Sequence, residues 1–538
     1  MFQQLLTPVG GSLGLSFVVA SLPILAVLIL LGWMRRPAWQ ASLAGLIVGL
    51  VVAVGVWRMP VGLAVDATLN GLVFALWPVM WIVFNAMLLY NVAVTSGRFD
   101  AFRRWTLDHL PNDRRIVLVA IGFCFGALLE GIAGFGTPVA ITSSLLIMVG
   151  FAPLEALVYV LIFNTAPVAF GALGVPVTTL GGVTGLPAPT LGAMIGRQLP
   201  FIAVILPFYV MFAYGGLRSI RATWPVLLVA GLSFAICQFV TANFIDYSLT
   251  DVFASLGSLV VTVGFLKLWR PAPDPEFAIA RPDGATAPAG AASVWQGWIP
   301  WLIVAAVVIV WTWFKIFAIG QIAIPWPGLD KAISITLYDN KPYAAVWTFQ
   351  PLATGTGILV AALIAAVVLG VSVEGFLASA ARTAKQIWLA VVTVCLIVGL
   401  AFLMNYSGLA YTLGKGVASV GAAFVVLSPF LGWVAVFLSG SDTSGNALFG
   451  NLQVVAAKQL GFNPVLFAAA NSSGGVMGKM ISPQNIATGV SVTELKGREG
   501  EVFARTFPHS VILTLIFGLL VALQQYVIPW IIPAVPGQ

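Results

Sequence analysis

The sequence predicts an all-α polytopic membrane protein, and composition together with hydropathy patterning supports this fold class. Of the 538 residues, 60% are hydrophobic and only 8% are charged, whereas roughly a quarter of the residues in a soluble domain are charged. The mean hydropathy is +1.02, and apolar stretches of about 20 residues, the length that crosses a bilayer, recur along nearly the whole chain. No water-soluble globule could bury so much apolar surface. Soluble enzymes, nucleic-acid-binding proteins and secreted disulfide scaffolds are therefore excluded.

The apolar stretches predict about 12 to 16 membrane crossings, with about 14 expected. The regular spans lie near residues 13–33, 38–57, 69–92, 116–130, 154–172, 191–213, 224–243, 251–269, 298–318, 352–371, 386–404, 417–439 and 508–532. Less regular segments, which could cross the membrane or enter and return, lie near 135–149, 445–460 and 464–480.

Lys and Arg residues gather at the ends of these spans, which is typical of cytoplasmic loops. The first apolar run is preceded by no basic residue and followed by Arg35 and Arg36, so we expect an uncleaved first helix and an outside N-terminus. The Pro/Ala/Gly-rich segment 271–294 is predicted to be a flexible cytoplasmic linker between two membrane halves, 1–270 and 295–538. Segment 320–350 is expected to be an external loop or a short amphipathic piece.

The two halves share a degenerate repeat, near residues 116–213 and 424–487. In each copy an Asn is followed by a Gly seven residues later and a Pro twelve residues later. The matching residues are Asn164, Gly171 and Pro176 in the first copy, and Asn471, Gly478 and Pro483 in the second. An odd number of crossings between the copies would make them inverted, and helices broken at matching places in inverted halves indicate a transporter's binding site.

The stretch between Arg115 and Gly150 is expected to break, because its 34 residues would form a helix about 51 Å long against a hydrocarbon core of ~30 Å. The expected helix-break residues of both copies are Gly131, Gly134, Gly136, Pro138, Pro176, Gly478 and Pro483. Freed backbone groups must face protein or a watery cavity, and half-helix N-termini there favour an anion. The alternative is that these glycines only pack helices closely.

Three ionisable residues are candidates for carrying a coupled proton. Glu130 ends an apolar run whose only polar member is Cys124, and a charged carboxylate at that depth is costly; the alternative places Glu130 among the lipid headgroups. Asp442 stands in the corresponding break of the second copy, where it could carry a proton, coordinate a cation or cap the next half-helix. His509 titrates near neutral pH, although a lone interfacial His is also compatible with a structural role.

Other polar residues at the breaks are candidates for binding a substrate anion. Lys479 and Arg197 are the candidate counter-charges, and Arg197 could instead anchor a helix start. The neutral candidates are Asn164, Thr165, Asn471, Ser472, Ser473, Ser441 and Thr443. The cysteines lie in apolar runs without CxxC or His/Cys spacing, so neither a metal nor a cofactor is expected.

Several segments resemble the bacterial L-lactate permease family. They are FCFGALLEGIAGFGTPVAIT (123–142), NTAPVAFGALGVPV (164–177), GRQLPF (196–201), NYSGL (405–409), SPFLGW (428–433), GSDTSGNALF (440–449) and GGVMGKMISPQNIA (474–487). The resemblance extends over essentially the whole chain and implies a secondary transporter of the cytoplasmic membrane, with inverted repeats and re-entrant hairpins. It implies uptake of lactate, and often of glycolate and other short 2-hydroxy-monocarboxylates, together with protons.

On this basis the expected partners are a small carboxylate, protons and the lipid bilayer, with no nucleic acid; a monomer and a homo-oligomer are both open. The substrate carboxylate would bind between the two breaks, and Glu130 or Asp442 would carry the proton. Coupling to Na⁺ is the main alternative, and a channel is another. An embedded enzyme is disfavoured, since there are two His residues and no HExxH motif.

Overall fold

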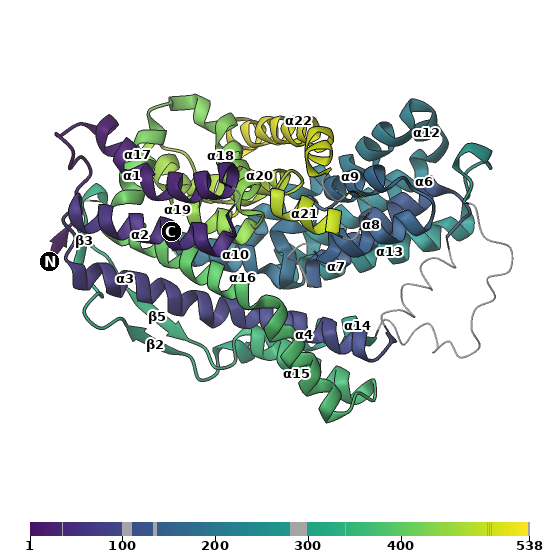
Figure 1. Ribbon diagram of the computed structural model, residues 1–538, viewed down its shortest axis with the longest axis horizontal. Helices are drawn as coiled ribbons and strands as arrows, with labels where there is room; N and C mark the ends of the chain where they lie inside the picture. The colour runs from purple at the N-terminus through teal and green to yellow at the C-terminus, as the bar shows by residue number, and fades with distance from the viewer. Residues whose placement is uncertain are drawn as a thin grey trace.

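The computed structural model describes residues 1–34, 36–98, 110–132, 137–279, 299–338, 340–491, 493, 495 and 498–535. Helices dominate it (Figure 1), which confirms the predicted all-α class. The helices of the first part are α1 (Leu13–Leu28), α2 (Ala38–Gly55), α3 (Val61–Phe74), α4 (Trp81–Thr95), α6 (Arg114–Val117), α7 (Gly126–Ile132), α8 (Thr137–Met148), α9 (Pro153–Phe163), α10 (Gly171–Thr184), α11 (Ala188–Ile195), α12 (Leu199–Val240) and α13 (Thr250–Leu268). Those of the second part are α14 (Ile299–Trp313), α15 (Thr354–Val368), α16 (Val373–Ser407), α17 (Leu409–Ala418), α18 (Phe424–Ser439), α19 (Asp442–Gln459), α20 (Pro464–Lys479), α21 (Pro483–Ser491) and α22 (Glu499–Tyr526).

Within the described residues, eight helical segments are long and apolar enough to cross a membrane, and the bent pair Pro153–Phe163 and Val168–Thr184 makes a ninth candidate. These segments identify a multi-pass membrane protein. The total of about 14 crossings stays a prediction, in part because single helical segments can contain more than one crossing.

The segment Ala188–Ile245 shows how two crossings merge. Its 58 residues would extend about 87 Å as one straight helix, nearly three times the hydrocarbon core. The helix is interrupted at Gly215 and Gly216, and the chain folds back there: a Cβ on Gly231 would lie 3.0 Å from the Val204 backbone. The predicted spans 191–213 and 224–243 are therefore the two arms of one helical hairpin.

Segment 320–350 contains short strands, which the sequence did not predict. Strand β2 (Ile322–Pro325) pairs with β5 (Val346–Phe349), and β3 (Ile333–Ile335) pairs with β4 (Lys341–Pro342), both antiparallel. The third partner is remote in sequence, because β1 (Phe2–Gln3) runs parallel to β3 with Phe2 opposite Ile333. Residues joined by backbone hydrogen bonds lie on one side of a membrane, so the chain crosses an even number of times between β1 and β3.

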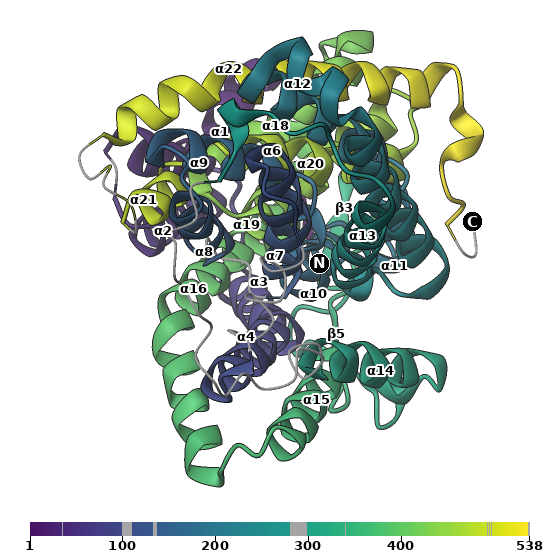
Figure 2. The same cartoon turned by 90° about the vertical axis from the view of Figure 1, so that its right-hand side faces the viewer.

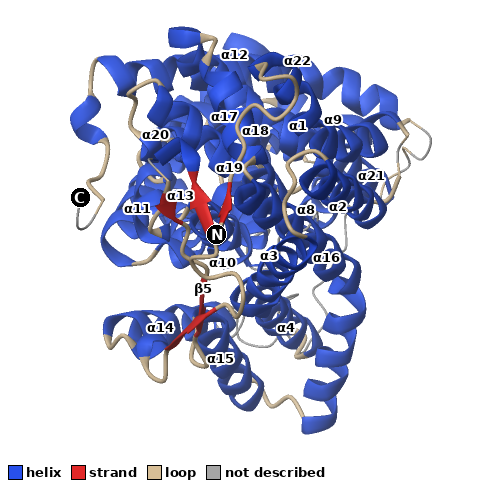
Figure 3. Cartoon of the chain, turned by 90° about the vertical axis from the view of Figure 1, so that its left-hand side faces the viewer, coloured by secondary structure: helices blue, strands red, loops and turns tan. Residues whose placement is uncertain are grey.

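A group of helices stands apart from the main body. Figures 2 and 3 show α4, α14 and α15 gathered at one end of the molecule, with the long helix α16 running from this group back to the other helices. There α16 packs against α2, α3 and α19. The predicted cytoplasmic linker begins after α13, beside α6 and α12. Its described residues include Asp274, which pairs with Arg218 at 2.9 Å, whereas residues 280–294 lie outside the described part and the division into halves stays a prediction.

Helices α18 and α20 cross at a stripe of small residues. A Cβ on Gly474 would lie 2.5 Å from the carbonyl oxygen of Pro429, and a Cβ on Gly478 would collide with the carbonyl oxygen of Trp433. Such residues let membrane helices approach closely where packing drives association. The prediction that Gly478 breaks a helix is wrong, because α20 continues through it to Lys479 and its role is close packing.

The contacts between the repeat copies follow a two-fold pattern. In the first copy the helices before and after the breaks are α7 with α8 and α9 with α10; in the second they are α18 with α19 and α20 with α21. Helix α10 packs on α19, and α8 packs on α21. Exchanging the two copies turns one of these contacts into the other, as expected of a repeat related by a two-fold axis.

Candidate functional site

A cavity of about 40 Å³ lies where the ends of α7, α10, α19, α20 and α21 meet. Its polar lining comes from both repeat copies: Glu130, Ser441, Asp442, Thr443, Lys479 and Gln484. Helices α10, α19 and α21 all begin here, so their N-termini bring partial positive charge and free N–H groups to the cavity. This is the half-helix arrangement that the paired breaks predict.

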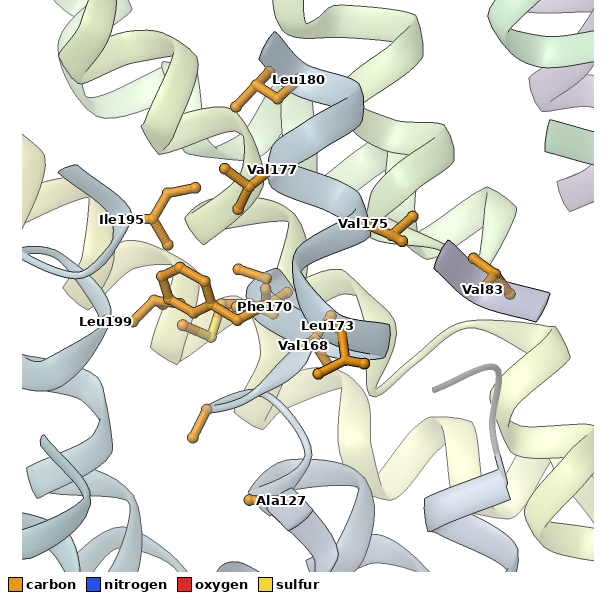
Figure 4. Packing of buried hydrophobic residues seen from close by; sticks show 14 of the residues in the cluster. Val83, Ala127, Val168, Phe170, Leu173, Val175, Val177, Leu180, Ile195 and Leu199 are labelled. Atoms are coloured by element: carbon orange, nitrogen blue, oxygen red, sulfur yellow. The ribbon is translucent and has the colours of Figure 1, made fainter. Parts of the chain in front are cut away.

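The start of α10 is held in an unusual backbone conformation. Ala172, Leu173 and Gly174 have φ values of 45°, 58° and 78°, in the left-handed region that residues with a Cβ adopt at a cost of about 1–3 kcal/mol each. Figure 4 shows the apolar side chains that enclose this turn, among them Val168 and Phe170 of the short helix η4 (Val168–Phe170). Strain of this kind persists only where the surroundings impose it, and it clusters at functional sites.

The central interaction is a buried ion pair between the two copies. Lys479 Nζ lies 2.5 Å from Glu130 Oε1, and the two residues are 5% and 2% exposed. Asn164 Nδ2 donates to the other carboxylate oxygen, Oε2, at 3.0 Å. A Cβ on Gly171 would lie 2.9 Å from Oε1, so glycine is what allows the start of α10 to approach the pair. Glu130 is thus buried within the protein, while its depth in the membrane stays a prediction.

Asp442 is held differently, by neutral donors alone. Its Oδ2 accepts hydrogen bonds from Ser472 Oγ at 2.5 Å and from Asn446 Nδ2 at 3.2 Å. For Oδ1 no partner is found among the described residues. Asp442 also lies close enough to Lys479 and Glu130 to interact electrostatically. The capping role belongs to the preceding residue, because Ser441 accepts from the Ser444 N–H at the start of α19.

A buried amide network supports the Asp442 side of the cavity. Asn471 donates to Asn446 Oδ1 at 3.0 Å and accepts from Gln453 Nε2 at 3.1 Å. It lies in the middle of α20 rather than at a break. The neighbouring Ser473 is fully buried, and its hydroxyl has no partner among the described residues. Asn471 therefore reaches Asp442 only through Asn446, and neither Asn471 nor Ser473 lines the cavity.

Two predicted site residues lie elsewhere. The Arg197 guanidinium donates to Asn243 Oδ1 at 2.8 Å and to the carbonyl oxygen of Ile531 at 2.5 Å, which fits the helix-anchoring alternative. His509 Nδ1 lies 2.6 Å from Tyr209 Oη. Neither residue lines the cavity, so the structure does not bring them together with Lys479.

The remaining predicted residues are Thr165 and the other helix-break residues. Thr165 is buried and donates to the carbonyl of Ile162 in its own helix end. Gly131 lies in α7, Pro138 is the second residue of α8, Pro176 follows the left-handed turn and Pro483 opens α21. Gly134 and Gly136 lie outside the described residues.

Three polar residues near the cavity were not predicted. Asn446 joins Asp442 to the amide network, and Gln484 lines the cavity from α21. Asp251, in the first turn of α13, is 1% exposed. Asn446 follows Asp442 by one helical turn, and this spacing was the available signal. Asp251 follows a polar segment and resembles an ordinary interfacial residue in sequence.

A larger cavity of about 470 Å³ lies at the opposite ends of α10 and α19. Its lining includes Thr184 at the end of α10, Lys458 near the end of α19, and the hydrogen-bonded pair Asn405 and Asn451. Strand residues such as Trp347 cover it from the segment that pairs with the N-terminus. The two packed helices thus connect a wide polar vestibule to the ion pair.

Comparison with known proteins places the chain in a family. A family model described as L-lactate permease matches residues 16–528. The L-lactate permease of Escherichia coli (strain K12) is 42% identical over 551 residues, covering 99% of this chain and 100% of the relative. Glycolate permease GlcA of the same strain is 42% identical over 551 residues, covering 97% and 98%. The L-lactate permease of Bacillus subtilis (strain 168) is 39% identical over 562 residues, covering 98% and 99%.

Among solved structures, the Alcanivorax borkumensis YdaH transporter has a TM-score of 0.45 and 16% identity, covering 87% of this chain and 89% of that chain. The family model and the curated relatives both span almost the full length of the sequence. Their names describe permeases, which move solutes across membranes and are not enzymes. The chain belongs to the L-lactate permease family.

Proposed function

We propose that this protein imports L-lactate, and short 2-hydroxy-monocarboxylates such as glycolate, together with protons across the bacterial cytoplasmic membrane. Curated relatives over 40% identical are named for L-lactate and for glycolate. The observation that carries the proposal is the buried Lys479–Glu130 pair at a cavity formed by three helix N-termini. Such a cavity combines a cation with oriented N–H groups, and both favour a carboxylate.

In this proposal Lys479 and the helix N-termini bind the substrate carboxylate. The substrate hydroxyl bonds Asp442, whose Oδ1 is unpartnered among the described residues, with Ser441 and Thr443 beside it. Asn164 holds Glu130, and Asn471 and Ser472 hold the Asp442 side. Ser473 supplies a further buried hydroxyl.

Coupling follows from competition for one cation. Glu130 forms an ion pair with Lys479 in this structure. A substrate carboxylate can therefore pair with Lys479 only after the Lys479–Glu130 pair has separated. Protonation of Glu130 removes the attraction, and the loaded site then contains a neutral acid and a Lys–carboxylate pair. The empty site contains the Lys–Glu pair. Lys479, Glu130 and the substrate together carry no net charge in either state, whereas substrate without a proton would add a buried negative charge, which is costly at depth. One proton therefore accompanies each monocarboxylate.

The cavity beside the ion pair is too small for a hydroxy acid in this conformation. A cavity of about 40 Å³ accommodates only a few water molecules, and a hydroxy acid requires the helix ends to separate. The vestibule of about 470 Å³ at the far ends of α10 and α19 is large enough for such a substrate to approach. Movement of these two helices would connect the vestibule with Lys479.

Uptake of labelled L-lactate into proteoliposomes tests the proposal, with an imposed inward proton gradient and no Na⁺. The expected result is accumulation above equilibrium that collapses when a protonophore is added. Accumulation that requires Na⁺ at constant pH would overturn proton coupling. Absence of lactate uptake and exchange, in a preparation that transports another carboxylate, would overturn the substrate assignment.

A further inference from the structure

Asp251 is a buried carboxyl group that the proposed function does not use. It is 1% exposed, and neither side-chain oxygen has a hydrogen-bond partner among the residues that the structure describes. Asp in the first turn of a helix is favoured by the partial charge of the N-terminus. That accounts for its sequence position, but a capping carboxylate would accept a backbone N–H, and Asp251 accepts none.

Asp251 lies directly against the residue that follows Glu130. Helix α13 packs on α7, and a Cβ on Gly131 would come within 2.6 Å of the Asp251 Cβ. Gly131, predicted from sequence as a break residue, lies within α7 and instead makes room for Asp251. Asp251 therefore lies near Glu130, close enough to interact electrostatically with both members of the ion pair.

The surroundings of Asp251 are poor in charge. Glu130 of α7 and Lys479 of α20 are the charged groups that act on it electrostatically. Two other titratable groups packed on α13 already have hydrogen-bond partners. The Tyr247 hydroxyl of η6 (Tyr247–Leu249) is bonded to Thr178, and the Cys124 thiol of η3 (Leu118–Phe125) is bonded to Ser258. Lys479 is already bonded to Glu130. An ionised Asp251 would have no hydrogen-bond donor among the described residues, and an uncompensated buried charge is costly, which favours the neutral, protonated form of the side chain.

The position of Asp251 also suits a connection to water. Asp251 is the fifth residue after Asp246, and every residue of the segment 243–247 is partly or fully exposed. Thr250 and Asp251 are buried, so burial sets in within one helical turn. Asp251 thus stands between a surface segment and Glu130.

We propose that Asp251 is a proton-binding site that delivers the coupled proton to Glu130. The O–H bond of Asp251 breaks as an O–H bond forms on Glu130, the Lys479–Glu130 pair separates, and Asp251 regains a proton from water at the segment 243–247. No electrons are transferred. This inference rests on the proposed lactate/proton import.

Replacement of Asp251 by Asn tests this assignment, since Asn has the same shape and cannot release a proton. In proteoliposomes, Asp251→Asn is expected to reduce the initial rate of proton-driven uptake of labelled L-lactate about 100-fold, while lactate–lactate counterflow at equal pH continues. Asp251→Glu is expected to restore accumulation with an altered pH profile. Glu155→Gln is the control, because Glu155 is an exposed carboxyl group in the first turn of another helix, α9, and this variant should accumulate lactate normally.

Wild-type accumulation by Asp251→Asn would overturn the inference and leave the proposed function intact. Loss of counterflow in a variant that remains monodisperse would also overturn it, because the residue would then be structural. If wild-type protein fails to accumulate lactate under a proton gradient, the proposed function itself fails. Wild-type accumulation driven by Na⁺ would identify a different coupling ion.

Discussion

Glu130 and Asp442 occupy corresponding breaks in the two repeat copies, but the protein compensates them in different ways. Glu130 faces a cation, Lys479, at 2.5 Å, whereas Asp442 is bonded to the neutral donors Ser472 and Asn446. An ion pair can exchange partners when one member is neutralised, while a hydrogen-bonded carboxyl group can remain in place in either protonation state. Within the proposed lactate/proton import, this difference favours Glu130 as the proton-coupling residue and Asp442 as the residue that positions the substrate, and both roles stay predictions.

Among the substitutions that test this difference, replacement of Lys479 is expected to have the largest effect on stability and transport. Lys479→Met leaves Glu130 buried without compensation, so we expect destabilisation of about 3–5 kcal/mol and loss of both accumulation and counterflow. Thermal unfolding in detergent and uptake in proteoliposomes measure these effects. The double variant Glu130→Gln/Lys479→Met should regain stability without regaining transport. Lys415→Met, at the partly buried end of α17, is the control, and an equal loss there would argue against a specific role for Lys479.

Replacement of Glu130 by Gln should separate coupling from binding. We expect Glu130→Gln to lose proton-driven accumulation while retaining lactate counterflow, because Lys479 remains to bind the carboxylate. Added L-lactate should also raise the melting temperature of this variant more than that of the wild type, since the competing carboxylate is gone. Differential scanning fluorimetry with and without L-lactate measures the shift. Intact accumulation would remove Glu130 from the coupling mechanism.

The smallest of these effects is expected at Asp442. Asp442→Asn exchanges one accepting carboxylate for an amide, with an expected cost of about 1–3 kcal/mol in stability and a raised KM for lactate. Proton-driven accumulation should continue, in contrast to Glu130→Gln. Initial uptake rates over a range of lactate concentrations provide the KM. Loss of proton coupling in this variant, with counterflow retained, would reverse the roles assigned to the two carboxyl groups.

Cavity residues could be predicted from the sequence where a polar or charged side chain lies inside a segment that must be buried. Glu130, Asp442 and Lys479 interrupt apolar or glycine-rich segments, and polar groups in such places must converge. Arg197 could not be assigned in this way, because an Arg at a helix start looks the same whether it binds a substrate or, as here, the Ile531 carbonyl. Asp251 was missed because burial changes within one turn there. A hydropathy average over a span cannot resolve that boundary.

The fold was predictable where the pattern was long and apolar, as in the hairpin of α12. The strands of segment 320–350 were not, because β3 obtains one partner from Phe2 and Gln3, more than 300 residues away in the sequence. Gly478 was misassigned for a related reason. A glycine that breaks a helix and a glycine that packs two helices differ only in the neighbour they meet, here Trp433.

The attachment of the first residues has a consequence for how the protein is made. Phe2 pairs with Ile333, and Gln4 Nε2 donates to the carbonyl of Asn405 at 2.8 Å. Residues 2–4 leave the ribosome long before these partners, which follow them by 331 and 401 positions. Contacts so distant in sequence form late. The wall of the vestibule is therefore completed only after most of the helices have been synthesised, when the N-terminal residues can join strand β3 and the end of α16.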